Sequence, residues 1–430
     1  MTTLKAVRGT RDLLPPETQL WNRIEATARR VFARYNFGEI RTPVFEDTSL
    51  FARGVGEETD IVSKEMYTWE DRARAQSERT LSLTLRPENT AGVVRAYIEH
   101  QLGETGQLQK LYYIGPQFRR ERPQKGRYRQ FSQIGAEVIG PPSAGSESPL
   151  RDAEVLEMLA TLLDELGISG WTLHLNSVGS AADRERYNET LRAALLPVAS
   201  RMCADCQRRA VTNPLRVLDC KVPEDQPIIE SLPRIAGSLG AESKAHFAEV
   251  TAALDAAGVP YKLNHRLVRG LDYYTRTTFE FTHGGLGAQN ALLGGGRYDG
   301  LSEAIGGPRA PGIGFAMGED RLALTLLAQQ AEQPEKAHAY IAPLGEAMNA
   351  PALALARELR RGGLAVELGD GSFRLKKSFE AADKCARRIV ILGEDELKSG
   401  ILTVKDFSTG TQTKVPRAEL VETLAKPAGE

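Results

Sequence analysis

Residues 109–140 read QKLYYIGPQFRRERPQKGRYRQFSQIGAEVIG. Side chains alternate at both ends of this stretch, which predicts two strands, QKLYYIGPQF and RYRQFSQIGAEVIG, joined by the loop ERPQKG. In the second strand, the period of two places these side chains on one face: Arg129, Phe131, Gln133 and Glu137. The opposite face carries apolar side chains, namely Ile134, Ala136 and Val138. We therefore expect a hairpin that turns one face to a core and presents polar groups on the other.

The hairpin is also the most basic part of the chain. Residues 117–131 contain six cations and one acid, Glu121; the cations are Arg119, Arg120, Arg122, Lys125, Arg127 and Arg129. The formal net charge of the whole chain is only -1, so the cluster indicates a local anionic partner rather than a basic protein. The planar donor fork of arginine suits phosphate oxygens, and Arg119 fits a polyphosphate ligand. For Arg120, Arg122 and Lys125, a solvated loop is the alternative interpretation.

Further helices and strands are predicted on both sides of the hairpin. Apolar side chains recur at helical spacing after Pro16, at Leu20, Ile24, Ala28, Val31 and Phe32. The extended run EIRTPVFED follows, and Pro43 should lie at a strand edge or end. LSLTL predicts a strand that breaks at Pro87 before a helix capped by Asn89 or Thr90. GIGFAMGEDRLALTLLAQQ predicts a strand that runs directly into a helix.

The pattern changes near residue 329. Residues 1–328 predict a large antiparallel sheet with flanking helices, with a mostly helical insertion at about 180–262. Residues 329–336 are expected to form a linker, and residues 337–430 alternate strands and helices as a compact α/β domain does. The predicted fold class is therefore α+β, with a separate α/β domain at the C-terminus.

The composition excludes several classes of protein. Hydrophobic residues make up 41% and charged residues 26% of the 430, as in an ordinary globular protein. No run approaches the ~18 apolar residues of a membrane helix, and the N-terminus has no apolar signal region. Four cysteines in this length do not form a disulfide framework. We therefore expect a cytoplasmic protein that does not bind membranes.

Two motifs leave alternatives open. GGGRYDG, residues 294–300, lacks the GxxxxGK[ST] pattern of a phosphate loop, so a tight turn is the simpler interpretation. Cys203 and Cys206 form a CxxC pair, and Cys220 follows fourteen residues later. A structural zinc site needs four ligands, and no fourth cysteine or histidine lies near in sequence. No zinc is therefore expected, and thiols without a metal are the favoured interpretation.

Arginines and carboxylates recur at the predicted strand ends. RPENT contains Glu88, RGLDYY contains Arg269, Tyr273 and Tyr274, and GEDRL contains Arg321. Such a mixture is what a site that binds both a phosphate and an amino group requires. No HExxH motif and no nucleophile elbow occur, so the sequence does not support a metalloprotease or a serine hydrolase.

The order of these motifs resembles a known family. The long helix with the strand near Pro43, FRRE with its basic loop, and GIGFAMGEDRL resemble motifs 1, 2 and 3 of class II aminoacyl-tRNA synthetases. TLRPEN, VRGLDYY and LGGGRYDGL resemble the histidyl-tRNA synthetases within that class. The resemblance implies an antiparallel sheet of six or seven strands, a helical insertion, a C-terminal anticodon-binding domain and a homodimer. It also implies ligation of L-histidine to tRNA(His) through an adenylate, at the expense of ATP with Mg²⁺.

Residue roles follow from the resemblance position by position. For ATP, it implies that Arg119 and Arg269 face the α-phosphate, Arg321 the γ-phosphate and Glu121 the adenine amino group. The histidine-binding residues that it implies are Glu88, Thr90, Arg119, Gln133, Glu137, Arg269, Tyr273 and Tyr274. Among these, Glu88 and Thr90 hold the α-ammonium group, Gln133 lies at the carboxylate, and Glu137 with Tyr274 reads the imidazole. Arg127 and Arg129 are expected near the acceptor end of the tRNA.

One departure and one alternative qualify the resemblance. Many members of the family read RPEGT where this chain has RPENT, and Asn89 tolerates a positive φ and can cap a helix. The alternative is a catalytically silent relative, such as the regulatory subunit of ATP phosphoribosyltransferase, which senses histidine. That subunit typically lacks the anticodon-binding domain, whereas residues 337–430 and the arginines 119, 269 and 321 are present here.

Overall fold

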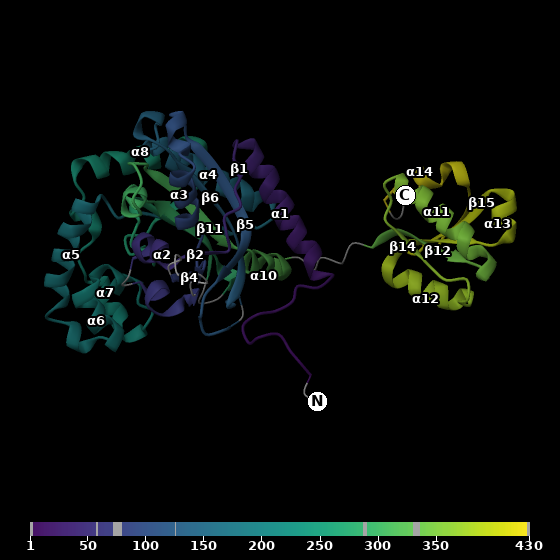
Figure 1. Ribbon diagram of the computed structural model, residues 1–430, viewed down its shortest axis with the longest axis horizontal. Helices are drawn as coiled ribbons and strands as arrows, with labels where there is room; N and C mark the ends of the chain where they lie inside the picture. Colours follow the sequence, from purple (N-terminus) through teal and green to yellow (C-terminus); the bar gives the residue numbers. More distant parts are fainter. Residues whose placement is uncertain are drawn as a thin grey trace. The chain divides into compact units, whose positions relative to one another are not determined.

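The computed structural model describes residues 3–56, 59–71, 80–124, 126–286, 290–329 and 336–427. The chain divides into two compact units, Met1–Glu332 and Gln333–Glu430 (Figure 1). Most of the linker expected at residues 329–336 lies outside the described residues, as does Lys125 of the basic loop. None of the helices in the described ranges is long and apolar enough to cross a membrane.

The first unit is built on an eight-stranded sheet. In spatial order its strands are β1 (Gly38–Glu39), β5 (Gln109–Phe118), β6 (Gln130–Ile139), β11 (Gly312–Gly318), β10 (Ala291–Arg297), β9 (Thr275–His283), β7 (Trp171–Ser177) and β8 (Tyr261–Leu263). The six strands from β5 to β7 pair antiparallel, whereas the short edge strands β1 and β8 pair parallel to their neighbours. The predicted hairpin is β5–β6, and the antiparallel sheet is confirmed.

Helices cover one face of this sheet. They are α1 (Glu17–Arg34), α4 (Pro149–Glu165), α8 (Ala241–Ala257) and α10 (Glu319–Gln329). All five apolar positions predicted for the first helix are buried in this core, together with Ile134, Ala136 and Val138 of β6. Burying each large aliphatic side chain contributes about 1.5–3 kcal/mol, so this face is fixed toward the core. The odd-numbered residues of β6 consequently point to the other face.

Smaller elements surround that other face. A three-stranded sheet has the order β2 (Phe45–Asp47), β4 (Leu81–Leu85) and β3 (Tyr67–Asp71). The helical elements here are α2 (Thr48–Val55), η1 (Ile61–Glu65), α3 (Thr90–Glu99), η2 (Leu102–Thr105), η3 (Pro142–Ala144) and α9 (Leu301–Ala304). By contrast, η8 (Gly284–Leu286) packs against the main core through Leu286. Pro43 lies between β1 and β2, outside both strands, where its missing N–H costs no ladder hydrogen bond.

The insertion has a core of its own. It contains α5 (Ala181–Leu195), η4 (Ala199–Arg201), α6 (Ala204–Thr212), η5 (Pro214–Asp219), η6 (Pro223–Asp225), α7 (Gln226–Glu230) and η7 (Ile235–Gly237). These helices gather at one end of the first unit (Figure 1). Their buried side chains, from Val178 to Ile235, form a cluster separate from the main core. By contrast, α8 packs in the main core and β8 extends the main sheet.

The second unit confirms the alternating pattern. Its elements are β12 (Ala337–Pro343), η9 (Glu346–Met348), α11 (Asn349–Arg361), β13 (Val366–Leu368), α12 (Leu375–Cys385), β14 (Ala386–Leu392), α13 (Glu394–Ser399), β15 (Ile401–Asp406), β16 (Gln412–Pro416), η10 (Arg417–Glu419) and α14 (Leu420–Ala425). The strand order is β13-β12-β14-β15-β16, with the first three parallel and the last two added antiparallel.

Candidate active site

A cavity of about 220 Å³ opens on the face of the sheet that the four large helices leave free. Its walls come from chain segments far apart in the sequence, because β6, β10 and β11 are neighbours in the sheet. The predicted site residues that line it are Glu88, Thr90, Arg119, Glu121, Gln133, Arg269, Tyr273, Tyr274 and Arg321. Among the residues predicted to bind histidine or ATP, only Glu137 does not appear on the wall.

Arg119 stands at the end of β5 and is held by its neighbours. Its Nε donates to the Pro87 carbonyl at 2.9 Å, and its guanidinium carbon lies 5.2 Å from the centre of the Phe131 ring. The carboxylate of Glu121 lies 3.8 Å from Nη1 of Arg119 and 3.1 Å from Nε of Arg127. Glu121 therefore separates two cations that would otherwise repel each other at the wall of the cavity.

Arg269 approaches the cavity from the loop before β9. Its Nη1 donates to Glu280 Oε2 at 2.7 Å, so β9 orients the guanidinium. The guanidinium lies directly over Gly294 of β10, where a Cβ atom would come within 2.5 Å of it. Gly296 leaves similar room for the ring of Tyr274, 2.8 Å from the position of a Cβ.

This contact corrects the interpretation of the glycine run as a tight turn. Residues 294–296 lie inside β10, and none of them has a positive φ. The run lacks side chains because an arginine and a tyrosine occupy the space above the strand. The glycine run is visible in the sequence. Its cause is not, because the side chains that need the space, Arg269 and Tyr274, lie about twenty positions earlier.

Arg321 lies in the first turn of α10, immediately after β11, as predicted. Its Nη1 donates to the Ala291 carbonyl at 2.7 Å. Burial, followed by repulsion from Arg127, lowers the pKa of Arg321. Arg119, Arg127, Arg269 and Arg321 thus line one cavity, which we call the arginine cavity. An anionic ligand with several charges would relieve the repulsion among them.

Glu88 caps the helix α3. Its two carboxylate oxygens accept the backbone N–H groups of Thr90 at 2.7 Å and Ala91 at 3.0 Å. Asn89 occupies the N-cap position as predicted, with φ -121°, but its side chain makes no cap hydrogen bond. The Asn89 Oδ1 accepts the hydroxyl of Thr42 at 2.6 Å instead. The turn of RPENT therefore needs no positive φ, and Glu88 is rigidly placed at the cavity wall.

Glu137 lies behind the wall and is fully buried. Its carboxylate accepts the hydroxyls of Thr90 and Tyr298, both at 2.7 Å. Desolvation raises the pKa of Glu137 to about 8, although both hydroxyls favour the charged form. Gly314 on the adjacent strand leaves space for this carboxylate, because a Cβ there would lie 1.7 Å from Oε2. Glu137 is thus one layer below the ligand cavity, connected to it by Thr90.

Several polar atoms at the cavity are buried without a hydrogen-bond partner among the described residues. Apart from Glu121 Oε2, which lies 3.1 Å from Arg127 Nε, they are Gln133 Oε1, Arg269 Nε and the hydroxyl of Tyr113. Buried polar groups in native proteins are nearly always satisfied, so such atoms at a cavity wall indicate where a polar ligand binds. Two of the three residues were predicted; Tyr113 was missed.

The missed residues share a cause. Tyr113 lines the cavity, Glu280 accepts a hydrogen bond from Arg269, and Tyr298 donates one to Glu137. Nothing in the local sequence distinguishes these three residues from ordinary sheet residues. The period of two in β5 and β9 could have placed Tyr113 and Glu280 on a face, and Tyr298 directly follows β10, but a period does not place a residue beside a particular partner.

The basic hairpin differs from its prediction at Arg129. The strand β6 begins at Gln130, so Arg129 is not part of its polar face. The guanidinium of Arg129 donates to the Arg8 carbonyl at 3.2 Å, and its aliphatic stem covers Gly9. The backbone N–H of Arg129 also donates to the Gly9 carbonyl at 2.7 Å. Arg129 therefore holds the N-terminal segment, whereas Arg127 lies at the cavity and Arg120 and Arg122 are exposed.

Comparison with known proteins agrees with this geometry. The family profile described as histidyl-tRNA synthetase matches residues 9–322, and the profile described as anticodon binding domain matches residues 338–426. A protein of Koribacter versatilis named histidine–tRNA ligase is 72% identical, covering 97% of this chain and 95% of its own. One of Solibacter usitatus with the same name is 55% identical, covering 98% and 99%.

Solved structures lead to the same family. The crystal structure of apo histidyl-tRNA synthetase from S. aureus is similar with a TM-score of 0.79 and 38% sequence identity. The similarity covers 99% of this chain and 100% of that one. It thus includes both units and the strands that carry the arginine cavity. The matches of profile, sequence and structure extend over nearly the whole chain, which belongs to the histidyl-tRNA synthetase family.

Proposed function

We propose that this chain is a histidine–tRNA ligase that activates L-histidine with ATP and transfers it to the 3′ end of tRNA(His). The observation that carries the proposal is the arginine cavity, which Arg119, Arg269 and Arg321 line together with Glu88 and Gln133. This combination suits a substrate pair of a triphosphate and an amino acid, because the cations face phosphates and the acid suits an ammonium group.

Activation requires positioning rather than a general base. The carboxylate of histidine is already ionised at neutral pH, so it can attack the α-phosphorus directly. The new bond joins the carboxylate oxygen to that phosphorus, and the bond to the bridging oxygen breaks to release pyrophosphate. Charge grows on the α-phosphoryl oxygens, where Arg119 and Arg269 would stabilise it from two sides. Arg321 would hold the γ-phosphate, and Glu121 would accept the adenine amino group.

Selection of histidine would use the polar groups of the wall. Glu88 and Thr90 would hold the α-ammonium group, and the unpaired Oε1 of Gln133 lies at the same wall. We propose that Tyr274 contacts the imidazole and that Glu137 acts with it from beneath the wall. Tyr273 packs 4.7 Å from Tyr274, ring centre to ring centre, and would orient it. A site built on such pairs rejects analogues that leave a buried polar group unpaired.

Magnesium would enter with ATP. The carboxylates at the wall already have partners: Glu88 accepts two backbone N–H groups, Glu121 pairs with Arg127, and Asp320 pairs with Arg11 at 2.8 Å. The phosphate oxygens of ATP, with water, would therefore supply most of the ligands, as Mg²⁺ commonly requires. The ion would neutralise charge on the departing pyrophosphate.

The transfer step would follow at the same cavity. The 3′-hydroxyl of the terminal adenosine of tRNA would attack the carbonyl of the adenylate and release AMP. Arg127 lies at the cavity wall, where a contact to the acceptor end would be possible during this step. The second unit, which matches the anticodon-binding profile, would bind the other end of the tRNA. We place this activity in the cytoplasm.

We also propose a homodimer. Phe45, Trp69 and Leu81 of the sheet β2-β4-β3 are 53%, 40% and 47% exposed, an apolar patch that a second copy could bury. Sedimentation analysis should give twice the mass of the chain, and Trp69→Glu should shift it toward the monomer. A monomeric wild-type protein at micromolar concentration would refute this part of the proposal.

The main test is histidine-dependent exchange between ATP and pyrophosphate. The wild-type protein should catalyse it, and Arg269→Ala should lower kcat/KM by about 100-fold or more, since a charge-stabilising donor is lost. Arg266→Ala in the same loop is the matched control, because Arg266 bonds to Gln226 and does not line the cavity. Absence of exchange in the wild type would refute the ligase; an unaffected Arg269→Ala would refute only the role of Arg269.

A further inference from the structure

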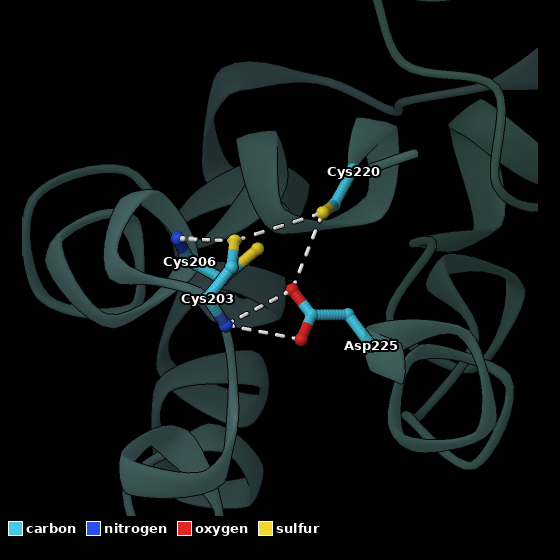
Figure 2. A group of neighbouring side chains, drawn as sticks. All are labelled: Cys203, Cys206, Cys220 and Asp225. Atoms are coloured by element: carbon cyan, nitrogen blue, oxygen red, sulfur yellow. Dashed lines mark hydrogen bonds between the residues drawn. The ribbon is translucent and has the colours of Figure 1, made fainter. Parts of the chain in front are cut away.

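Four potential metal ligands lie together in the insertion: Cys203, Cys206, Cys220 and Asp225 (Figure 2). Their three sulfur atoms and one carboxylate oxygen all lie within 4.8 Å of one another. We call this set the cysteine cluster. The three cysteines can be recognised in the sequence, but the fourth member cannot, because an aspartate five residues after Cys220 does not by itself indicate a metal ligand. The arginine cavity uses none of these four side chains.

The distances are close to those of a tetrahedral site. Cys203 Sγ lies 3.9 Å from Cys220 Sγ, and Cys220 Sγ lies 3.3 Å from Asp225 Oδ2 (Figure 2). Zinc bonds of about 2.3 Å to sulfur and about 2.0 Å to oxygen, at tetrahedral angles, separate two sulfurs by about 3.8 Å and a sulfur from an oxygen by about 3.5 Å. A disulfide needs about 2.05 Å between sulfurs, and all of these cysteines are free thiols.

The charge of Asp225 favours a cation in the cluster. Asp225 is only 1% exposed, and no lysine, arginine or histidine within the described ranges forms an ion pair with it; the nearby Lys221 contacts Asp219 instead, at 3.5 Å. Its carboxylate instead accepts the backbone N–H of Cys203 at 3.0 Å and the thiol of Cys220 at 3.3 Å. A buried carboxylate without a cationic partner is costly, and buried charges are usually paired or bind metals. A divalent ion would supply the missing charge.

Backbone groups around the cluster are also arranged for thiolate ligands. The N–H of Cys206 points to Cys203 Sγ at 3.5 Å, and the N–H of Val222 points to Cys220 Sγ at 3.4 Å. Such donors orient the sulfur lone pairs and offset the negative charge of a metal-bound thiolate. Cys203 is in addition the N-cap residue of α6, where the helix dipole favours negative charge.

The position of the cluster explains why a metal would be useful. The cluster joins the start of α6, the residue after η5 and the last residue of η6. These are short elements around a small core, and small cores commonly need a disulfide or a metal to be stable. Arg216 of η5 pairs with Asp60 at 3.2 Å and donates to the Gly270 carbonyl at 2.8 Å, next to Arg269. A fixed η5 therefore supports the loop that carries Arg269.

We propose that Cys203, Cys206, Cys220 and Asp225 form a structural Zn²⁺ site that fixes the insertion. Three sulfur ligands select a soft or borderline ion such as zinc over Mg²⁺ or Ca²⁺. Four ligands from the protein complete the tetrahedron and leave no position for water or substrate, which makes the site structural rather than catalytic. The sequence predicts no zinc because no fourth cysteine or histidine lies near the three cysteines, whereas in the structure Asp225 occupies the fourth position.

The first test is the metal content of the full chain, purified without a histidine tag under reducing conditions from cells supplied with zinc. Elemental analysis should find about one zinc ion per chain, retained after gel filtration. Cys220→Ser and Asp225→Asn should each lose most of it. The matched controls, Cys385→Ser in the second unit and Asp205→Asn beside the cluster, should retain it. Wild-type protein with only trace zinc, or a disulfide within the cluster, would overturn the proposal.

A second measurement covers variants that fail to fold. The wild-type chain, stripped with a chelator and reconstituted with Co²⁺ alone, should show the visible absorption of tetrahedral cobalt and intense thiolate-to-cobalt charge-transfer bands. Added Zn²⁺ should abolish both. The stripped protein should also unfold at a lower temperature and regain its midpoint with Zn²⁺, since an ion that binds the folded state stabilises it. Octahedral cobalt without thiolate bands, or a midpoint that zinc does not change, would overturn the proposal.

Discussion

The arginine cavity and the cysteine cluster both gather polar side chains from separate segments, but they differ in which groups remain available. In the cavity, Gln133 Oε1 and Arg269 Nε have no partner among the described residues. In the cluster, the sulfur atoms and the carboxylate point toward one another (Figure 2). Groups without partners are suited to substrates that come and go, whereas a closed set suits one resident ion. Changes in the cavity should therefore alter activity, and changes in the cluster should alter stability.

Among conservative changes, Arg119→Lys should have the largest effect on activity. Lysine keeps the charge but loses the planar fork, so histidine-dependent exchange should fall by about 100-fold. The midpoint of thermal unfolding should shift by less than about 2 °C, because no core contact is removed. Arg122→Lys, on the exposed part of the same loop, should leave both quantities unchanged. A large loss of stability in Arg119→Lys would contradict the expectation that changes in the cavity alter activity and not stability.

Gly294→Ala should have the next largest effect. A Cβ at this position would lie 2.5 Å from the guanidinium of Arg269, which must then move. Misplacement of a charge-stabilising group by about 1 Å costs up to about 100-fold, so exchange should fall by about 10- to 100-fold. Gly300→Ala is the matched control, since nothing lies within 4 Å of a Cβ there. Equal rates for the two variants would mean that Arg269 does not need its observed position.

Arg216→Ala tests whether the two regions are coupled. Loss of its contacts to Asp60 and Gly270 should loosen the loop before Arg269 and lower exchange by less than about tenfold. The zinc content should stay as in the wild type, because Arg216 is not a ligand. Arg208→Ala, which removes an exposed pair with Asp205, serves as the control. Loss of zinc together with activity would show that the cavity and the cluster are not independent regions.

The smallest effect concerns pH. Desolvation raises the pKa of Glu137 from 4.5 to about 8, so the folded chain binds a proton that the unfolded chain has released between these values. The contribution of Glu137 to the free energy of unfolding is fully present below pH 4.5 and is lost as the pH rises toward and through about 8. Glu137→Gln removes this titration. The unfolding midpoint of the wild type, minus that of the variant, should therefore decrease from pH 6 to pH 8.

A constant difference across that range would show that Glu137 is ionised throughout. The comparison uses Glu137→Gln rather than the wild type alone because burial also raises the pKa of Glu319, to about 7. Both proteins share that second titration, so it cancels in the difference.

Predictions from local pattern succeeded where a segment is long and regular. The apolar spacing of residues 20–32 placed α1, and the alternation in residues 130–139 placed Gln133 on the cavity side and Ile134 in the core. Irregular segments were less predictable. Asn89 is the N-cap residue of α3, but its side chain does not cap the helix. Arg129 lies outside β6, and the glycines of β10 do not form a turn. In each case a contact from another segment decides the conformation.

The sequence by itself determined the class of fold, the order of the motifs and the family, because helix and strand periods and motif order are properties of neighbouring residues. It also determined most of the residues of the arginine cavity, through the resemblance that those motifs carry. Only the tertiary structure decided that Glu280 orients Arg269, that Gly294 makes room for it, and that Asp225 joins three cysteines. These facts depend on distances between remote segments, which no local period encodes.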